Sequence, residues 1–153
     1  MSADFPPSWY ASSLPEPAAL PPLRGEVQAD VAVLGAGYTG LTAALELAQR
    51  GYRVVMLEAK RIGWGASGRN GGQALVGYGC EVDELERQLG RDDARHLFDW
   101  SREAVQSMRQ RIARHGIDCH WVEGRASVAI RARHESDLRA GCERLQRHHD
   151  YPM

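Results

Sequence analysis

The architecture of this chain follows from one segment, Asp30-Val31-Ala32-Val33-Leu34-Gly35-Ala36-Gly37-Tyr38-Thr39-Gly40. Residues 30–34 form a short apolar run that ends in glycine, which is typical of a parallel strand buried on both faces. Over residues 39–50 the apolar positions recur at helical spacing, at Leu41, Ala44, Leu45 and Ala48. Gly51 stands where a left-handed residue closes a helix. Residues 53–57 repeat the strand pattern, so the sequence predicts a βαβ unit.

Three glycines between the first strand and the helix indicate a phosphate site. Gly35 allows the tight turn that leaves the strand, and Gly37 lets a pyrophosphate approach the backbone. Gly40 allows the helix to pack closely against the sheet. The first N–H groups of the helix, including those of Tyr38 and Thr39, then point at the phosphates, aided by the positive end of the helix dipole. We therefore expect these residues to bind a dinucleotide.

An acidic residue closes the second strand. Glu58 lies 18 residues after Gly40, where its carboxylate can accept hydrogen bonds from the hydroxyls of an adenosine ribose. A carboxylate at this place repels a 2′-phosphate, although the nearby Lys60 and Arg61 weaken that exclusion. Together with Ala59, Glu58 and Lys60 make up the predicted ribose end of the site.

The next segment, residues 61–73, is rich in glycine and free of acids. It contains five glycines, the two cations Arg61 and Arg69, and the polar side chains Ser67 and Asn70. Such a composition suits either a ligand-binding loop or a flexible linker. A long polar loop directly after the ribose-binding acid favours a cofactor larger than a nicotinamide dinucleotide.

Residues 30–73 resemble the N-terminal region of FAD-dependent oxidoreductases of the D-amino-acid oxidase superfamily. Within them, residues 65–73 are most similar to the amine-oxidising branch, the branch of the gamma-glutamylputrescine oxidoreductases, through Gly65-Ala66-Ser67-Gly68-Arg69-Asn70-Gly71-Gly72-Gln73. The resemblance implies that the three motif glycines hold the pyrophosphate of FAD and that Glu58 holds the ribose. It places Ser67, Asn70, Gly71 and Gly72 along the pyrophosphate and ribityl path, with Gln73 nearer the flavin ring. Residues 61–79 contain no His or Cys for a covalent flavin link, so we expect noncovalent FAD.

The implied activity is oxidation of a C–N bond in a small-molecule amine or amino acid, with hydride passing to the flavin. Members of the superfamily are several hundred residues long, so we expect this chain to be an incomplete, inactive portion. No catalytic residue can be assigned within it. Two alternatives remain open from the residues alone: a fragment of an NAD(P)-dependent Rossmann dehydrogenase, and a non-catalytic fragment or binding module.

The expected fold is α/β, a Rossmann-like βαβ FAD-binding unit with an incomplete sheet, followed by helices and the start of an α+β substrate domain. We divide the chain into a proline-rich, extended leader (1–28), the FAD-binding unit (29–80) and the truncated substrate domain (81–153). In the last part the patterns predict helices over 82–89 and 92–115, a β-hairpin of strands 117–122 and 126–132, and a helix with Ser136 as its N-cap. Because two strands and one helix cannot cover a doubly wound sheet, we expect exposed apolar surface.

Composition limits the remaining possibilities. The 153 residues carry a formal net charge of -1, which gives no electrostatic support for a nucleic-acid partner. No apolar run is long enough for a membrane span, and no secretory signal is visible. The three widely spaced cysteines and six histidines suggest neither a disulfide framework nor a metal site. We therefore expect a cytoplasmic protein without a bound metal.

Overall fold

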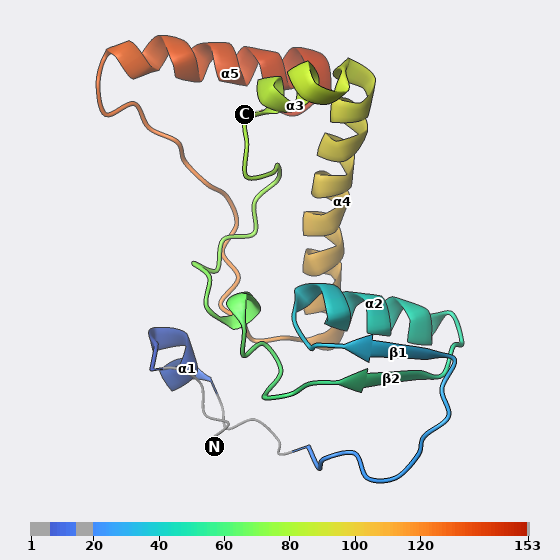
Figure 1. Cartoon of the computed structure of the whole chain (residues 1–153). Helices are drawn as coiled ribbons and strands as arrows, with labels where there is room; N and C mark the ends of the chain where they lie inside the picture. The colour runs from blue at the N-terminus through green and yellow to red at the C-terminus, as the bar shows by residue number, and fades with distance from the viewer. Residues whose placement is uncertain (1–6, 15–19, 153) are drawn as a thin grey trace. The chain divides into compact units, whose positions relative to one another are not determined.

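The computed structural model describes residues 7–14 and 20–152, and the chain divides into two compact units, residues 1–73 and 74–153. This division precedes the boundary after Cys80 that composition predicts. The first unit contains α1 (Trp9–Ser13), β1 (Val31–Leu34), α2 (Tyr38–Gln49), β2 (Val54–Leu57) and the short 3₁₀ turn η1 (Ala66–Gly68). The second contains α3 (Val82–Leu89), α4 (Arg91–His115) and α5 (Arg133–His149) (Figure 1).

The predicted βαβ unit is confirmed. β1 and β2 pair in parallel, with Val31 opposite Val54 and Leu34 opposite Leu57. α2 connects them and lies along one side of the two-stranded sheet (Figure 1). Gly51 follows α2 with a φ of 89°, the left-handed conformation that closes a helix at little cost only for glycine. The strand–helix–strand order thus forms one part of a Rossmann-like unit.

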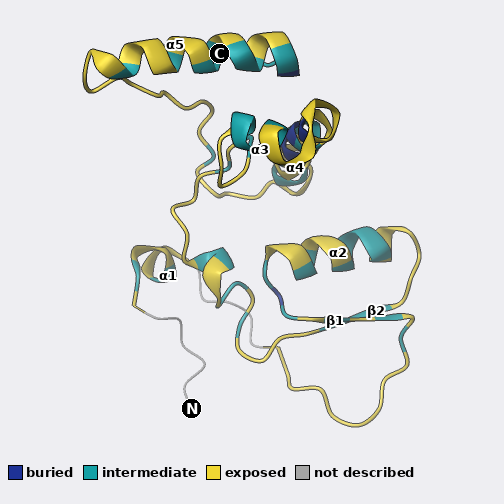
Figure 2. Ribbon diagram, turned by 45° about the horizontal axis from the view of Figure 1, so that its top comes forward, coloured by how far each residue is buried: buried dark blue, intermediate teal, exposed yellow. Residues whose placement is uncertain are grey.

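The prediction that the first strand is buried on both faces is wrong. Val31 and Val33 are half-buried, whereas Ala32 and Leu34 are exposed, Leu34 at 80%. Successive side chains of a strand point to opposite faces, and α2 packs along one side of the sheet. The colours of β1 and β2 in Figure 2 show this incomplete burial. The expectation that the sheet leaves apolar surface exposed is confirmed.

The proline-rich leader contains one short helix, which its composition did not predict. Ser8 begins α1 by accepting a hydrogen bond from the Ala11 N–H at 3.1 Å. Residues 20–28 contain no helix or strand, as expected for an extended leader. Residues 1–6 and 15–19, which belong to the same prediction, lie outside the described residues.

The second unit is built from helices around a small core. α3 and α4 match their predicted bounds within one residue, and Gly116 ends α4 in the left-handed conformation with a φ of 57°. Ala94 and Phe98 of α4 are buried. The ring of His149, at the end of α5, lies 4.6 Å from the ring of Phe98, and the ring of Tyr151 lies 5.5 Å from it.

The predicted β-hairpin is wrong. Residues 117–130 form no strand, and Val122, Val128 and Ile130 are between 75% and 86% exposed. A hairpin is marginal in water unless further strands or a helix cover its apolar face. The described part of the second unit contains no strand that could pair with it. Glu123, predicted to form the turn, instead pairs with Arg109 of α4 at 2.7 Å. The described residues therefore do not bear out an α+β arrangement for this unit.

The predicted start of the last helix is also wrong. α5 begins at Arg133, and Ser136 lies within it as a helical residue. The Ser136 hydroxyl donates to the Arg133 carbonyl at 3.2 Å instead of accepting from a backbone N–H. A helical first turn also allows Glu135 to pair with Arg139, one turn further on, at 2.8 Å.

Candidate functional site

The turn between β1 and α2 requires glycine at two positions. Gly35 has a φ of 95°, and its N–H donates to the Leu57 carbonyl at 2.7 Å, which ties the turn to the end of β2. A Cβ on Gly40 would lie 2.0 Å from the Gly35 carbonyl oxygen and 3.3 Å from Cγ1 of Val33. The helix therefore approaches the strand too closely for any side chain at residue 40, as the motif predicts.

The first turn of α2 offers backbone donors. Its first helical hydrogen bond runs from the Leu41 N–H to the Gly37 carbonyl at 2.9 Å. The N–H groups of Tyr38, Thr39 and Gly40 precede that bond, and such groups have no acceptor within their own helix. Together with the helix dipole they favour an anion at this end.

Ser67 of the glycine-rich loop lies at this same end of α2. Its Oγ accepts a hydrogen bond from the Tyr38 N–H at 3.0 Å. A Cβ on Gly37 would come within 2.9 Å of that oxygen. The loop is further joined to the turn because the Gly63 N–H donates to the Ala36 carbonyl at 2.9 Å. The missing side chain of Gly37 thus makes room for Ser67, a contact that spacing alone does not predict.

Asn70 fixes the shape of the loop. Its Nδ2 donates to the Ser67 carbonyl at 2.8 Å, to the Ala66 carbonyl at 3.3 Å and to the Tyr38 hydroxyl at 3.1 Å. Its Oδ1 accepts from the Gly72 N–H at 2.8 Å. One amide side chain thereby joins the 3₁₀ turn η1, the following glycines and the first residue of α2.

Glu58 binds the backbone on both sides of the site. One carboxylate oxygen, Oε2, accepts from the Ala36 N–H at 2.8 Å, and Oε1 accepts from the Lys60 N–H at 2.8 Å. These hydrogen bonds, that from Ala36 above all, hold the pKa of Glu58 below its ordinary value of 4.5. An ionised carboxylate has about four acceptor positions, so it can still accept hydrogen bonds from a ribose.

Two cations of the loop region lie against Trp64. The ammonium of Lys60 is 4.7 Å from the centre of its ring, and the guanidinium carbon of Arg69 is 4.9 Å from it. Arg69 also donates through Nε to the Gly65 carbonyl at 3.2 Å. Cation–π contacts hold such side chains in place without neutralising them, so the loop keeps its positive charge.

The structure brings together most, but not all, of the residues predicted to bind a cofactor. The β1–α2 turn, Glu58, Ser67 and Asn70 are joined by the contacts above. Gly71 and Gln73 are exposed, and a Cβ on Gly71 would meet nothing within 4 Å. Their place along a ribityl path and near a flavin ring stays a prediction.

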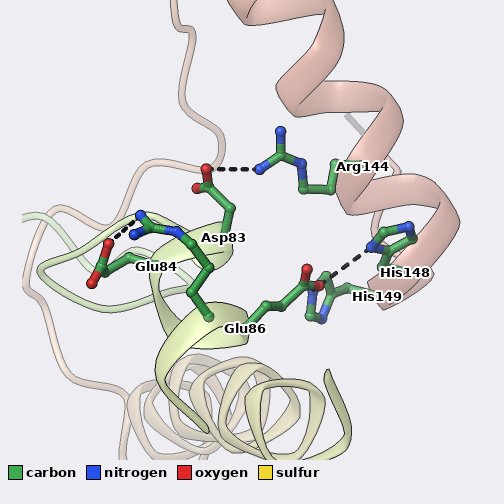
Figure 3. Close-up of polar contacts among 7 residues, drawn as sticks. Asp83, Glu84, Glu86, Arg144, His148 and His149 are labelled. Atoms are coloured by element: carbon green, nitrogen blue, oxygen red, sulfur yellow. Dashed lines mark hydrogen bonds and ion pairs between the residues drawn. The ribbon is translucent and has the colours of Figure 1, made fainter. Parts of the chain in front are cut away.

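A second polar cluster lies in the unit of residues 74–153. Glu86 of α3 contacts both His148 and His149, in each case through Oε1 and a ring nitrogen at 3.3 Å, while Asp83 pairs with Arg144 at 3.0 Å (Figure 3). His149 is fully buried, and its Nδ1 has no hydrogen-bond partner. The sequence suggested no role for this histidine, because its neighbours Glu86 and Phe98 are distant along the chain. Within the described residues, no three His, Cys, Asp or Glu side chains are arranged to hold a metal ion.

Comparison with known proteins places the chain in a family. Residues 30–153 match the family model described as DAO, FAD dependent oxidoreductase. The chain is 44% identical to the "Probable oxidoreductase OrdL" of Haemophilus influenzae over 131 residues. This match covers 86% of this chain and 30% of that protein. It is 42% identical over 141 residues to the gamma-glutamylputrescine oxidoreductase of Escherichia coli, covering 92% of this chain and 33% of that protein. No solved structure matches.

The chain belongs to the DAO family of FAD-dependent oxidoreductases. It spans about a third of the length of the curated relatives it matches. The site fits the cofactor of this family on its own geometry, because it combines a glycine-rich turn, N–H donors at a helix start and a carboxylate held ionised by backbone hydrogen bonds. Membership of this family favours FAD over the nicotinamide alternative. In the part of the chain that is described, no helix is long and apolar enough to cross a membrane.

Proposed function

We propose that residues 30–73 bind the ADP half of FAD noncovalently, in a protein that oxidises the C–N bond of an amine or amino acid. One observation carries the binding part of this proposal. Ser67, from the loop after β2, lies at the N-terminus of α2 and accepts the Tyr38 N–H there, so the loop and the glycine turn form one site. A flexible linker would have no reason to lie against the turn in this way.

Each part of the site has a task in this proposal. The N–H groups of Thr39 and Gly40, which precede the first helical hydrogen bond, and the dipole of α2 stabilise the two negative charges of the pyrophosphate. The Tyr38 N–H holds Ser67 beside these charges. The Ser67 hydroxyl adds a group that can donate or accept beside them. Glu58 stays ionised because its pKa is lowered, and its remaining lone pairs accept hydrogen bonds from the ribose hydroxyls.

The reaction class is supported by the relatives. The name of the relative in Escherichia coli states that it acts on gamma-glutamylputrescine, and the loop of residues 65–73 is similar to the amine-oxidising branch. Bound FAD supplies an acceptor for the hydride that leaves the carbon beside the nitrogen. The residues described above bind and orient the cofactor for that step, and none of them is assigned to the amine.

The test starts from the protein expressed from its whole gene. We expect it to purify with the yellow absorbance of a flavin, and we expect acid precipitation to release that flavin into the supernatant. Hydrogen peroxide release is then measured over a panel of amines and amino acids. A protein that stays colourless after FAD is added would contradict the proposed site, and flavin that remains in the precipitate would contradict noncovalent binding.

The same assay separates the remaining alternative. If the protein binds FAD but no amine or amino acid of the panel reduces that FAD, the result would favour a non-catalytic module. Glu58→Ala in the same protein tests where the cofactor binds, because loss of the ribose-binding carboxylate should lower the affinity for FAD about tenfold. An unchanged affinity would mean that the cofactor binds elsewhere.

A further inference from the structure

We propose that the side chains of Tyr38 and Asn70 act as a positioning pair, which holds Ser67 at the start of α2 and thereby raises the affinity of the site for the pyrophosphate. This inference rests on the proposed function. The glycine motif assigns only a backbone N–H to Tyr38. The structure gives its hydroxyl a second task, because that hydroxyl accepts from Nδ2 of Asn70 at 3.1 Å.

The contacts of the two residues close a ring. The Tyr38 N–H donates to the hydroxyl of Ser67, and the carbonyl of Ser67 accepts from Asn70 at 2.8 Å. Asn70 then returns to Tyr38 through the tyrosine hydroxyl. The amide of Asn70 is itself held, because its oxygen accepts from the Gly72 N–H. Ser67 is therefore fixed through both its backbone and its hydroxyl.

This ring of hydrogen bonds among Tyr38, Ser67 and Asn70 lies at the phosphate end of the site and not at the adenosine end. Ser67 lies against Gly37, in the space that a side chain at residue 37 would fill. The ribose end depends on Glu58, which accepts hydrogen bonds from the N–H groups of Ala36 and Lys60. Loss of the pair should thus weaken ligands that carry a pyrophosphate and leave adenosine binding unchanged.

Removing the tyrosine hydroxyl is a mild change to the fold. The Tyr38 side chain is 59% exposed, so Tyr38→Phe opens no cavity and removes one hydrogen bond. Tyr52→Phe is the matched control, since Tyr52 lies in the same unit, follows the opposite end of α2 and is 50% exposed. Asn70→Ala removes the donor of the same hydrogen bond, together with the other contacts of that side chain.

The experiment uses the whole protein, stripped of FAD and titrated with FAD, ADP and adenosine. We expect Tyr38→Phe to weaken FAD and ADP about threefold to tenfold, while adenosine affinity and the midpoint of thermal unfolding match those of Tyr52→Phe. In an Asn70→Ala background, Tyr38→Phe should cause no further loss, because the two residues act as one pair.

Equal ADP affinity in wild type and Tyr38→Phe would overturn the inference. So would an equal loss for ADP and adenosine, because that would reveal general damage to the unit. Additive losses in the double variant would overturn the pairing itself. If the wild-type protein binds neither FAD nor ADP, the proposed function fails and the inference falls with it, a result that is distinct because it appears without any substitution.

Discussion

The two units use polar side chains for different ends. Around the β1–α2 turn the polar side chains hold backbone groups, as Ser67 and Glu58 do with the N–H groups of Tyr38 and Ala36. Between α3 and α5 they join side chains of two helices, and Glu86 meets a histidine that is fully buried. An exposed turn at the start of a helix is suited to a ligand, whereas a contact with a buried histidine is suited to holding helices together. The first unit should therefore respond to substitution in cofactor affinity, and the second in stability.

The largest effect is expected at Gly40. In Gly40→Ala the new methyl group would lie 2.0 Å from the Gly35 carbonyl oxygen, a backbone atom that cannot move without disrupting the turn. We expect a loss of about 3 kcal/mol or more in the free energy of unfolding, and no FAD retained after purification. Thermal unfolding followed by circular dichroism and the flavin absorbance measure the two results.

Gly65→Ala is the control for that substitution. Gly65 has a φ of −76°, and a Cβ there would meet nothing within 4 Å. Its stability should stay within about 0.5 kcal/mol of wild type. If Gly40→Ala were as stable as Gly65→Ala, the close approach of α2 to the turn would not exist in solution.

The second effect falls on the other unit. Glu86→Ala removes the carboxylate that contacts His149 and leaves a second ring nitrogen of that buried histidine without a partner. We expect a loss of about 1–2 kcal/mol in stability with no change in the affinity for FAD. Urea unfolding and FAD titration of the same preparation measure both.

Glu84→Ala separates this effect from a general loss of charge or helix propensity in α3. Glu84 pairs with Arg87 and accepts from Gln88 on the same helix, and the side chains of Arg87 and Glu84 are 69% and 35% exposed. Such surface pairs contribute at most about 1 kcal/mol. If Glu86→Ala and Glu84→Ala lowered the stability equally, the contact of Glu86 with the buried His149 would not stabilise the unit more than a surface pair does. The contrast between the two units would then be wrong.

The third effect returns to the site. Ser67→Ala removes the acceptor of the Tyr38 N–H, but water can replace it because the bond is exposed. We expect FAD to bind about fivefold more weakly and the stability to change little. Ser107→Ala on the exposed face of α4 serves as the control. If Ser67→Ala leaves the affinity for FAD unchanged, the loop is not part of the FAD site.

The same contrast explains what the sequence could predict. The βαβ unit follows from local patterns, because the glycines, the helix period and Glu58 each depend on residues close in the chain. The contact of Ser67 with the start of α2 depends on a turn 29 residues away, so composition could suggest a ligand loop without showing where it lies. In the second unit the alternation in residues 117–132 predicted strands, but an alternating pattern needs a partner sheet to become one. His149 could not be recognised as buried because its packing on Phe98 is set by the meeting of α4 and α5.

The smallest effect concerns the far end of the sheet, where Asp30 forms two side-chain hydrogen bonds with Arg53. The Arg53 guanidinium holds the pKa of Asp30 below its ordinary value of 3.8. A carboxylate whose pKa is lowered by folding stabilises the fold at pH values above its unfolded pKa, and this contribution is lost as the pH falls through the folded pKa. The side chains of Arg53 and Asp30 are 68% and 39% exposed, so salt should screen the pair.

We expect Asp30→Asn to be slightly less stable than wild type near neutral pH in low salt. This difference should vanish in high salt and as the pH falls below the ordinary value of 3.8. Urea unfolding across that range, with Glu26→Gln as the control for loss of one exposed acid before the same strand, measures the effect. A difference that persisted in acid and in high salt would show that the charge of Asp30 does not carry the effect, because the amide oxygen of the substituted asparagine can still accept from the Arg53 N–H.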